Sequence, residues 1–552
     1  MRKLFLAAVA AFAVSASSYA GGYLTNTNQN ASYLRNPARL ATFELDGAYS
    51  NPAGLAWIGE GWHFMFNWQN AAQTRKITST FAPFAQNVNQ LGNPTKTFKG
   101  EASAPFIPSL DVAYQKGKFT ASMHFGITGG GGKATFNEGL PMFEAPVSVL
   151  PGTLSKLYSS INSIDPRYNH TADGYYAEMY MNGRQYIYGV QVGVTYKFFE
   201  NKGAAKHGLS IHLGARMNFA SNHYEGYLRN IKVNIDGTLI TPAPYFEKEL
   251  CPELRQCAAV LNNKSQQANQ AAEQATAAAQ QYTLLAEATT DEALKAQYQA
   301  VAAQFAKGAA KYADGAAKYA AGAMEFEGAA QKLSDPELTA DKQLDCDQKG
   351  WGIAPIIGLD YRVGNLNIGA RYEFQTNMNI ENKTTVNTTG VESFAHGVNT
   401  PNDIPGILAI GAQYQVLPKW RLMAGWNCYF DKKAGMSGGK QKTLTHNTHE
   451  ITVGTEVDVV DRLTLSGGFQ NTDYGLSDTF QSDLSFSCDS YSLGFGLTVK
   501  STKKWTANAA YFWTTYKDYT KASDNYNGTG LPGVDVYSRT NKVFGVGITY
   551  DL

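Results

Sequence analysis

Aromatic and apolar residues at every second position are the feature that most constrains this chain. The first run places Trp62, Phe64, Phe66 and Trp68 on one face and His63, Met65, Asn67 and Gln69 on the other. Successive side chains of a β-strand point to opposite faces, so this period of two predicts a strand. The pattern recurs to the end of the chain and predicts fourteen strands in all. The others are Leu110–Tyr114, Phe119–Ile127, Tyr186–Phe198, Leu209–Phe219, Trp351–Tyr361, Leu366–Phe374, Leu408–Val416, Trp420–Trp426, Ile451–Val459, Leu463–Phe469, Tyr491–Val499, Trp505–Trp513 and Phe544–Leu552.

The connections between these strands alternate in length. Short turns, such as Lys116-Gly117 and Gly364-Asn365, alternate with long polar connections, such as Ile77 to Ala104, Thr128 to Gly183 and Asn234 to Lys349. An even strand number with short turns at one end and long loops at the other is typical of an outer-membrane barrel. A soluble all-β sandwich is the alternative, but it has no need of such regular asymmetry.

Residues Met1 to Ala20 have the pattern of a secretory signal peptide. Arg2 and Lys3 precede an apolar run from Leu4 to Val14, and small residues suit cleavage before Gly21. A single-pass anchor is the alternative, although the run is short for a bilayer. The signal peptide predicts export, and the barrel predicts the outer membrane of a Gram-negative type of cell. A formal net charge of +1 gives no reason to expect a nucleic-acid partner.

The segment from Gly21 to Ile58 differs from the rest because it carries two Asn-Pro-Ala triplets, Asn36-Pro37-Ala38 and Asn51-Pro52-Ala53. Proline removes a backbone donor and disfavours helix at the residue before it, which predicts a compact, kinked segment. We interpret residues 21–58 as an internal plug, and residues 59–552 as the barrel that encloses it.

An insertion from Cys251 to Cys346 interrupts the strand pattern. It is rich in alanine and glutamine, and it predicts a helix from about Asp291 to Leu333, paired with Gln256 to Ala288 in an antiparallel hairpin on an external loop. Disorder is the alternative, because each glycine in the segment weakens a helix by about 1 kcal/mol relative to alanine. A heptad of large residues argues against disorder: Tyr298, Phe305, Tyr312, Tyr319, Phe326 and Leu333.

The five cysteines leave at least one thiol unpaired within a monomer. Cys257 and Cys346 bracket the hairpin, so a disulfide between them is a possible pairing in an oxidising compartment, with Cys251 as a competing partner. No pair or cluster of Cys and His has the spacing of a zinc site, so we expect no metal and no cofactor. No GxSxG motif or other arranged nucleophile occurs, which argues against an enzyme.

The chain resembles the FadL/TodX family of outer-membrane transporters for long-chain fatty acids and other hydrophobic compounds. Several motifs occur in the family's order over nearly all of the mature chain outside the insertion. They are Gly21-Gly22-Tyr23-Leu24, Asn51-Pro52-Ala53, Ile107-Pro108-Ser109, Trp351-Gly352, Asp403-Ile404-Pro405 and the terminal strand from Phe544-Gly545.

The resemblance implies uptake of an apolar molecule through a plugged barrel. The ligand would be captured at an external apolar groove, would meet Gly21, Gly22, Tyr23 and Leu24 inside, and would leave sideways at a kink in the third strand. The matching residues are Gly129, Gly130, Gly131 and Gly132, and glycine runs weaken strand pairing. From composition alone, a flexible loop start is the alternative for this run.

Two departures from the family pattern concern the ligand and the insertion. No basic residue matches the one that serves the carboxylate of fatty acids, although Arg216 and His223 lie nearby as possible polar contacts in the lumen. The helical hairpin has no counterpart in the pattern. A surface adhesin, receptor or structural barrel that binds an unknown surface partner through the hairpin is therefore the alternative function. We expect a monomer in contact with outer-membrane lipid.

Overall fold

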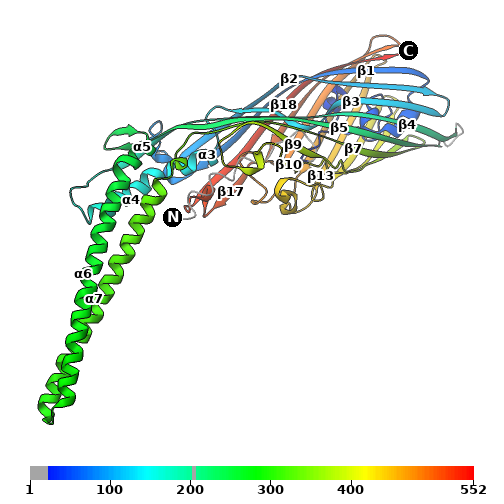
Figure 1. Cartoon of the computed structure of the whole chain (residues 1–552). Helices are drawn as coiled ribbons and strands as arrows, with labels where there is room; N and C mark the ends of the chain where they lie inside the picture. The colour runs from blue at the N-terminus through cyan, green and yellow to red at the C-terminus, as the bar shows by residue number, and fades with distance from the viewer. Residues whose placement is uncertain (1–22, 202–206) are drawn as a thin grey trace.

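The computed structural model describes residues 23–201 and 207–552, and Figure 1 shows a tilted barrel with a long helical hairpin at one end. Residues 1–20, where the signal peptide is predicted, and Gly21 and Gly22 lie outside the described residues. Antiparallel pairing runs from each wall strand to the next, and β1 pairs with both β2 and β18, which closes the barrel. The fourteen-stranded barrel predicted from the sequence is confirmed. The wall strands are β1 (Gly61–Thr80), β2 (Thr95–Lys116), β3 (Phe119–Phe136), β4 (Ala172–Asn201), β5 (His207–Ile235), β7 (Lys342–Val363), β8 (Leu366–Glu373), β11 (Ile407–Leu417), β12 (Trp420–Tyr429), β13 (Thr448–Val460), β14 (Leu463–Asp473), β15 (Ser490–Lys500), β16 (Trp505–Tyr516) and β18 (Gly533–Asp551).

The strands extend well beyond the apolar segments from which they were predicted. On β1 the outward side chains change from Trp62 and Phe66 to Thr74 and Thr78, and the two threonines bond to threonines of β18 and β2. The two ends of each predicted loop, Ile77 to Ala104 and Thr128 to Gly183, are therefore part of the adjoining strands. The sequence pattern missed them because hydroxyl-bearing side chains replace apolar ones on the outward face.

The plug fills the lumen near the end where the C-terminus lies (Figure 1). It contains α1 (Ala31–Arg35), α2 (Gly47–Ser50) and the 3-10 helix η1 (Pro52–Trp57). Asn30 caps α1, because its side chain accepts a hydrogen bond from the backbone N–H of Tyr33 at 2.9 Å. Every residue from Tyr23 to Ala56 is buried except Phe43, Glu44 and Ser50, which are half-buried.

Helices and short strands close the outer end of the barrel. α3 (Pro141–Ser148) is buried throughout, and α4 (Leu150–Asn162) buries only the face that carries Leu154, Tyr158 and Ile161. The remaining short elements are η2 (Ala82–Gln86), β6 (Thr238–Ile240), α5 (Pro242–Tyr245), η3 (Phe246–Leu250), η4 (Pro336–Leu338), β9 (Asn379–Asn387), η5 (Glu392–Phe394), β10 (Asn399–Pro401), η6 (Ser437–Thr443), β17 (Tyr519–Ser523) and η7 (Tyr526–Gly528).

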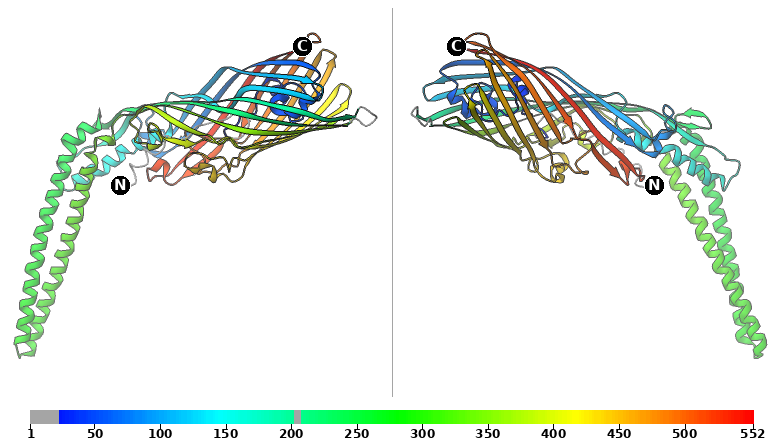
Figure 2. Two further views of the ribbon diagram at one scale, coloured as in Figure 1. Left: turned by 45° about the vertical axis from the view of Figure 1, so that its right-hand side comes forward. Right: turned by 180° about the vertical axis from the view of Figure 1, so that it is seen from behind.

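The insertion forms the predicted hairpin of α6 (Cys251–Ala288) and α7 (Glu292–Leu333), which projects away from the barrel in both views of Figure 2. Asp291 caps α7 by accepting the backbone N–H of Ala293 at 2.9 Å. Alanines spaced seven residues apart on α7 are buried against α6, whereas the rings of Phe305, Tyr312 and Tyr319 are half-exposed. The buried alanines are Ala302, Ala309, Ala316, Ala323 and Ala330. Among the described helices, none is both long enough and apolar enough to cross a membrane.

The predicted disulfide between Cys257 and Cys346 is wrong, because all five cysteines are free and buried. Cys257 lies on α6 in the apolar cluster at the hairpin base. Cys346 lies in β7, in the cluster inside the barrel, where it accepts a hydrogen bond from the hydroxyl of Thr384 at 3.3 Å. The insertion therefore ends before Cys346, since β7 begins at Lys342.

Candidate functional site

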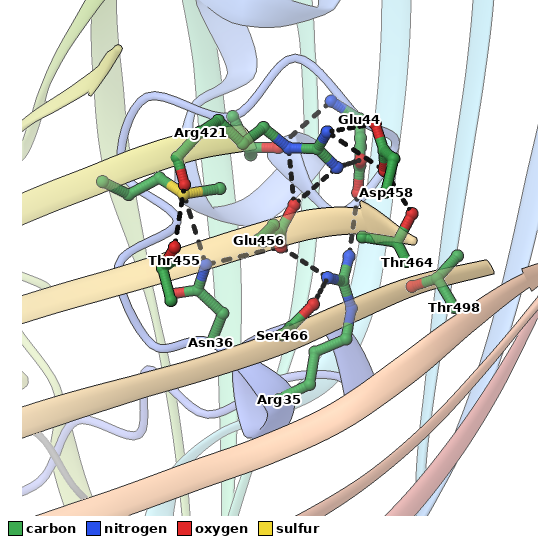
Figure 3. Close-up of polar contacts among 12 residues, drawn as sticks. Arg35, Asn36, Glu44, Arg421, Thr455, Glu456, Asp458, Thr464, Ser466 and Thr498 are labelled. Carbon is green, nitrogen blue, oxygen red and sulfur yellow. Dashed lines mark hydrogen bonds and ion pairs between the residues drawn. The ribbon is translucent and has the colours of Figure 1, made fainter. Parts of the chain in front are cut away.

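Charged side chains hold the plug against the barrel wall (Figure 3). The carboxylate of Glu456, on β13, accepts hydrogen bonds from Arg35 and, at 3.1 Å, from Arg39 of the plug. Arg421 on β12 bonds to the other oxygen of Glu456 at 2.7 Å. Glu456 and the two plug arginines are almost fully buried. In such surroundings a charge without its partner is costly, so the network ties the plug to one position.

Each Asn-Pro-Ala triplet uses its asparagine to join the plug to a buried acid on the wall. The side chain of Asn36 accepts the backbone N–H of Ala38 at 3.1 Å and donates to Glu456 at 3.4 Å. Asn51 donates to the carbonyl of Thr42 at 2.9 Å and to Asp360 on β7 at 2.6 Å. Both asparagines therefore fix the plug's own turns and its contact with the barrel.

Glycines on the inner face of the wall make room for the plug. A side chain at Gly454 would lie 1.9 Å from Oδ1 of Asn36, and one at Gly494 would lie 2.2 Å from the carbonyl oxygen of Leu34. Such separations leave no space for a Cβ atom, so the plug backbone rests directly on the strands. Atoms of the plug also lie within 2.8 Å of the Cβ position at Gly369, Gly411, Gly468, Gly496 and Gly545 on other strands.

The described beginning of the plug, Tyr23 and Leu24, lines a small cavity in the lumen. The Tyr23 hydroxyl donates to the carbonyl of Tyr474 at 3.1 Å, and its ring packs against Phe480 with 4.4 Å between centroids. The cavity has a volume of ≈ 50 Å³ and also contacts Tyr224 of β5. Tyr224 lines a second cavity as well, of ≈ 40 Å³, which reaches Gly132 on β3.

Strand pairing is interrupted between β2 and β3 beside these cavities. The pairs Leu110 with Phe125 and Glu101 with Thr135 flank a stretch where the two strands are unpaired. Along this stretch β2 remains paired with β1, and β3 remains partly paired with β4. The predicted glycine run therefore lies within a strand at an interruption of the wall.

Extra residues in β3 cause the irregularity. From Ile127 to Gly132 the strand advances five residues, while its partner β4 advances three, from Tyr188 to Gln185. The two additional residues form bulges, and Gly130 and Gly132 have φ of 92° and 71°, which glycine adopts without strain.

The plug occupies the inner side of this interruption. The backbone N–H of Asn26 donates to the carbonyl of Thr128 at 2.9 Å, and the side chains of Asn26 and Gln29 donate to the carbonyl of Ile127 at 2.9 and 3.0 Å. A Cβ atom at Gly129 would lie 2.1 Å from the carbonyl oxygen of Leu24. The first residues of the plug thus take the place of β2 as partner of the bulged strand.

The two polar residues expected in the lumen lie on opposite faces of β5. Arg216 points inward, where it pairs with Glu373 at 2.6 Å and lies over the ring of Tyr49 in the plug. His223 points outward and pairs with Asp347 at 3.0 Å, so its assignment to the lumen is wrong. Side chains of a strand alternate between its two faces. His223 is an even number of positions from the outward-facing Phe219 and an odd number of positions from the inward-facing Arg216, so it faces outward.

The loop between β14 and β15 covers the outer mouth of the lumen through Asp483. This buried carboxylate accepts the backbone N–H of Met142 at 2.8 Å and the hydroxyl of Tyr537 at 3.0 Å. Tyr537 also contacts Asp535 of β18 at 3.4 Å. Burial, with the nearby charge of Asp535, raises the pKa of Asp483 from 3.8 to about 7. Lys521 on β17 opposes this rise in pKa.

The loop is therefore expected to close more firmly as the pH falls. Between pH values near 4 and near 7, Asp483 is protonated when the loop is closed and ionised when the loop is open. Acidification over this range therefore favours the closed loop. Hydrogen exchange of residues 474–487 at pH 5 and pH 8, corrected for intrinsic rates, measures the effect. Asp483→Asn should reduce the difference, although the neighbouring buried Asp535 remains. Asp478→Asn, at an exposed position of the same loop, should keep it. Equal protection of the unmodified loop at both pH values would contradict this expectation.

The sequence did not point to the Glu456 network or to the Asp483 contact. The alternation could have indicated the Glu456 network, because Arg421 and Glu456 lie on the inward face of strands whose outward residues are apolar. Within the described residues, no group of three His, Cys, Asp or Glu side chains is arranged to hold a metal ion.

Comparison with solved structures agrees with this architecture. No protein-family model matches the sequence, and no curated protein matches it by sequence. A FadL homologue of Pseudomonas aeruginosa aligns over 96% of this chain and 100% of its own, with a TM-score of 0.55 and 11% identity. The toluene transporters TodX of P. putida and TbuX of Ralstonia pickettii align over 92% and 93% of this chain and 94% and 98% of their own, with 12% identity each and TM-scores of 0.47 and 0.44. The chain has the fold of the FadL homologue.

Proposed function

We propose that this chain is an outer-membrane transporter that takes up hydrophobic compounds through a plugged barrel with a lateral exit. The interruption between β2 and β3, with the start of the plug against its inner side, is the observation that carries this proposal. The similarity to a FadL homologue and to transporters of toluene supports the class of ligand.

A side exit suits an apolar ligand for an energetic reason. Burial of each CH₂ group in hydrocarbon is favourable by about 0.8 kcal/mol, so a route into the bilayer is preferable to a water-filled pore. The plug blocks the axis of the barrel with buried charge pairs, whereas its described contacts with β3 beside the interruption include no ion pair and consist of hydrogen bonds from Asn26 and Gln29 and close packing of Leu24. The start of the plug is therefore the part that a ligand could displace at least cost.

Within this proposal, Tyr23 and Leu24 contact the ligand in the lumen, together with Gly21 and Gly22 before them. The two described cavities, which share Tyr224, mark the path from Tyr23 to the bulges of β3. Their small volumes indicate that the ligand enters as the start of the plug moves. Arg216 is assigned to holding Tyr49 in place, and not to the ligand.

Deletion of Gly130 and Gly131 tests the exit. It removes two residues, the number by which β3 exceeds β4 between Ile127 and Gly132, so the bulged stretch can straighten against β4. We expect uptake of a radiolabelled long-chain fatty acid or of toluene, in a host without a transporter of its own, to fall to the background rate. Heat-modifiable migration in gel electrophoresis is expected to stay that of a folded barrel.

Deletion of Leu91 and Gly92, two exposed residues of the loop between β1 and β2, is the matched control and should preserve uptake. A folded variant that lacks Gly130 and Gly131 and still takes up either compound at the full rate would rule out this exit. Loss of uptake in both deletions would show a general sensitivity of the barrel, and would also argue against the specific route.

A further inference from the structure

Two basic side chains lie opposite each other on the outer surface of the wall, directly after the glycine run of β3. Lys133 on β3 and Arg184 on β4 are partners in the antiparallel register. Both are exposed, whereas the next residues, Ala134 and Gln185, are buried, so the two side chains leave the wall on its outward face. The Cβ atoms of such partners lie about 4.5–5.5 Å apart, and like charges at these positions are destabilising. This β3–β4 basic pair therefore lowers stability unless an anion lies beside it.

No carboxylate of the described residues neutralises the β3–β4 basic pair. Neither Lys133 nor Arg184 has an ion pair or a side-chain hydrogen bond within this part of the chain. The register continues from Arg184 to His223 on β5, which already pairs with Asp347 at 3.0 Å. Glu225 is the next acid along β5, but it forms no ion pair with Arg184. The positive charge of the pair is thus available to an external anion.

A second pair of opposite lysines on the outer surface shows how the protein relieves such repulsion by itself. Lys76 on β1 lies opposite Lys99 on β2, and both are exposed. Lys99 forms an ion pair with Glu101, two positions further along the same strand, at 2.5 Å. The corresponding positions beside the β3–β4 basic pair carry the uncharged Thr135 and Asn182. The internal acid that serves the lysines of β1 and β2 is therefore missing here.

Aromatic rings place the β3–β4 basic pair at the edge of the lipid-facing band. Tyr188, Phe219 and Trp351 form an exposed row across β4, β5 and β7. Such rings mark the boundary between hydrocarbon and headgroups. Arg184 is the next outward residue of β4 beyond Tyr186, about 7 Å further along the strand, toward the end that carries the hairpin. The pair therefore lies at the level of the lipid headgroups.

We infer that the β3–β4 basic pair binds the phosphate group of an anionic lipid in the outer leaflet. A phosphate monoester carries a charge of about −1.5 to −2 at neutral pH, which matches two adjacent cations. The planar guanidinium of Arg184 suits two parallel hydrogen bonds to phosphate oxygens, and Lys133 adds a point charge. The acyl chains of the lipid would lie against the apolar outer face beside Tyr186 and Tyr188. This inference concerns the outer surface of the wall and does not depend on the proposed uptake function.

Acetylation of lysines in lipid nanodiscs tests the assignment, because a bound phosphate shields Lys133 from a water-soluble reagent. The full-length protein is placed in phosphatidylcholine with a small fraction of phosphatidic acid, or with twice that fraction of phosphatidylglycerol, a diester. Mass spectrometry measures the rate at each lysine. Lys542 is the internal reference, since it is exposed on β18 opposite the uncharged Ala72 and Trp513. We expect phosphatidic acid to slow the acetylation of Lys133 several-fold relative to that of Lys542.

Matched variants separate the basic pair from its surroundings. Since an exposed ion pair contributes up to about 1 kcal/mol, R184Q should raise the fraction of phosphatidic acid that half-protects Lys133 about fivefold. R184K keeps the charge and should keep most of the protection. K76Q alters the lysine pair of β1 and β2 and should leave the protection of Lys133 unchanged. Heat-modifiable migration establishes that each variant is folded.

Several results would overturn the inference. They are an absence of protection at Lys133, equal slowing at Lys542, which would report only the surface charge of the bilayer, and protection that persists in R184Q. Equal protection by phosphatidylglycerol would contradict the assignment to a phosphate monoester. Inorganic phosphate added to nanodiscs of phosphatidylcholine alone should protect Lys133 little. Full protection by inorganic phosphate would indicate a site for free anions and would contradict the assignment to a lipid.

Discussion

Glu456→Ala is expected to release the plug and to convert a closed barrel into a conducting one. The substitution removes the wall carboxylate that Arg35 and Arg39 share, but Glu44 of the plug stays paired with both. The cost should therefore lie below the about 3–5 kcal/mol that is typical when a buried charge loses its partner. Most of the free energy lost is that of plug docking, because the backbone hydrogen bonds between wall strands do not involve this side chain, although its ion pair with Arg421 of β12 is lost as well. Single-channel recording in planar bilayers measures the effect as openings that the unmodified protein lacks.

Asp458→Ala is the matched control for this variant. Asp458 lies on the same strand and pairs with Arg421 at 3.2 Å, but no bond joins it to Arg35 or Arg39. The control should remain closed. Folded Glu456→Ala protein with no openings would show that the plug stays docked without its buried charges, and would contradict the role assigned to them.

Gly454→Val is expected to displace the plug by a steric route. A Cβ atom at this position would lie 1.9 Å from Oδ1 of Asn36, so this side chain must leave its place and lose its bonds to Ala38 and Glu456. Overpacking of a core commonly costs about 1–3 kcal/mol, and so severe an overlap should reach the upper end of that range. The same recordings should show openings, while heat-modifiable migration stays that of a folded barrel.

A second substitution makes this prediction specific. Asn36→Ala removes the atoms that the new side chain would meet, so the double variant should close again more often than Gly454→Val alone. Gly467→Val is the matched control on β14, since the nearest atom to its Cβ position is 3.8 Å away. Openings that are equal in the single and double variants would contradict direct contact between Gly454 and Asn36.

The sequence predicted the barrel well because alternation is a local signal. The run from Trp62 to Trp68 identifies a strand and the face that meets apolar surroundings. Where both faces are polar, as at Thr74 and Thr78, this signal disappears and the strand was taken for a loop. The length of a barrel strand therefore cannot be obtained from the apolar pattern alone.

Contacts between distant parts of the chain were beyond such a signal. Arg35 and Glu456 are separated by 421 residues, and nothing local to either predicts their pairing. For Cys257 and Cys346 the sequence predicted a contact that does not exist, because the two residues bracket the insertion but form no disulfide in the fold. The Asn-Pro-Ala triplets were placed in the plug from proline chemistry, whereas their partners Glu456 and Asp360 required the structure.

The hydroxyl-bearing outer parts of the strands separate the mouth of the barrel from the bilayer. β4 has 30 residues, whereas a tilted strand needs only about 9–11 to cross the hydrocarbon layer. Most of this strand thus extends beyond the hydrocarbon layer into polar surroundings. On the proposed uptake route, a hydrophobic molecule that enters at the mouth would be shielded by protein through that polar zone until it reaches the interruption beside Gly129.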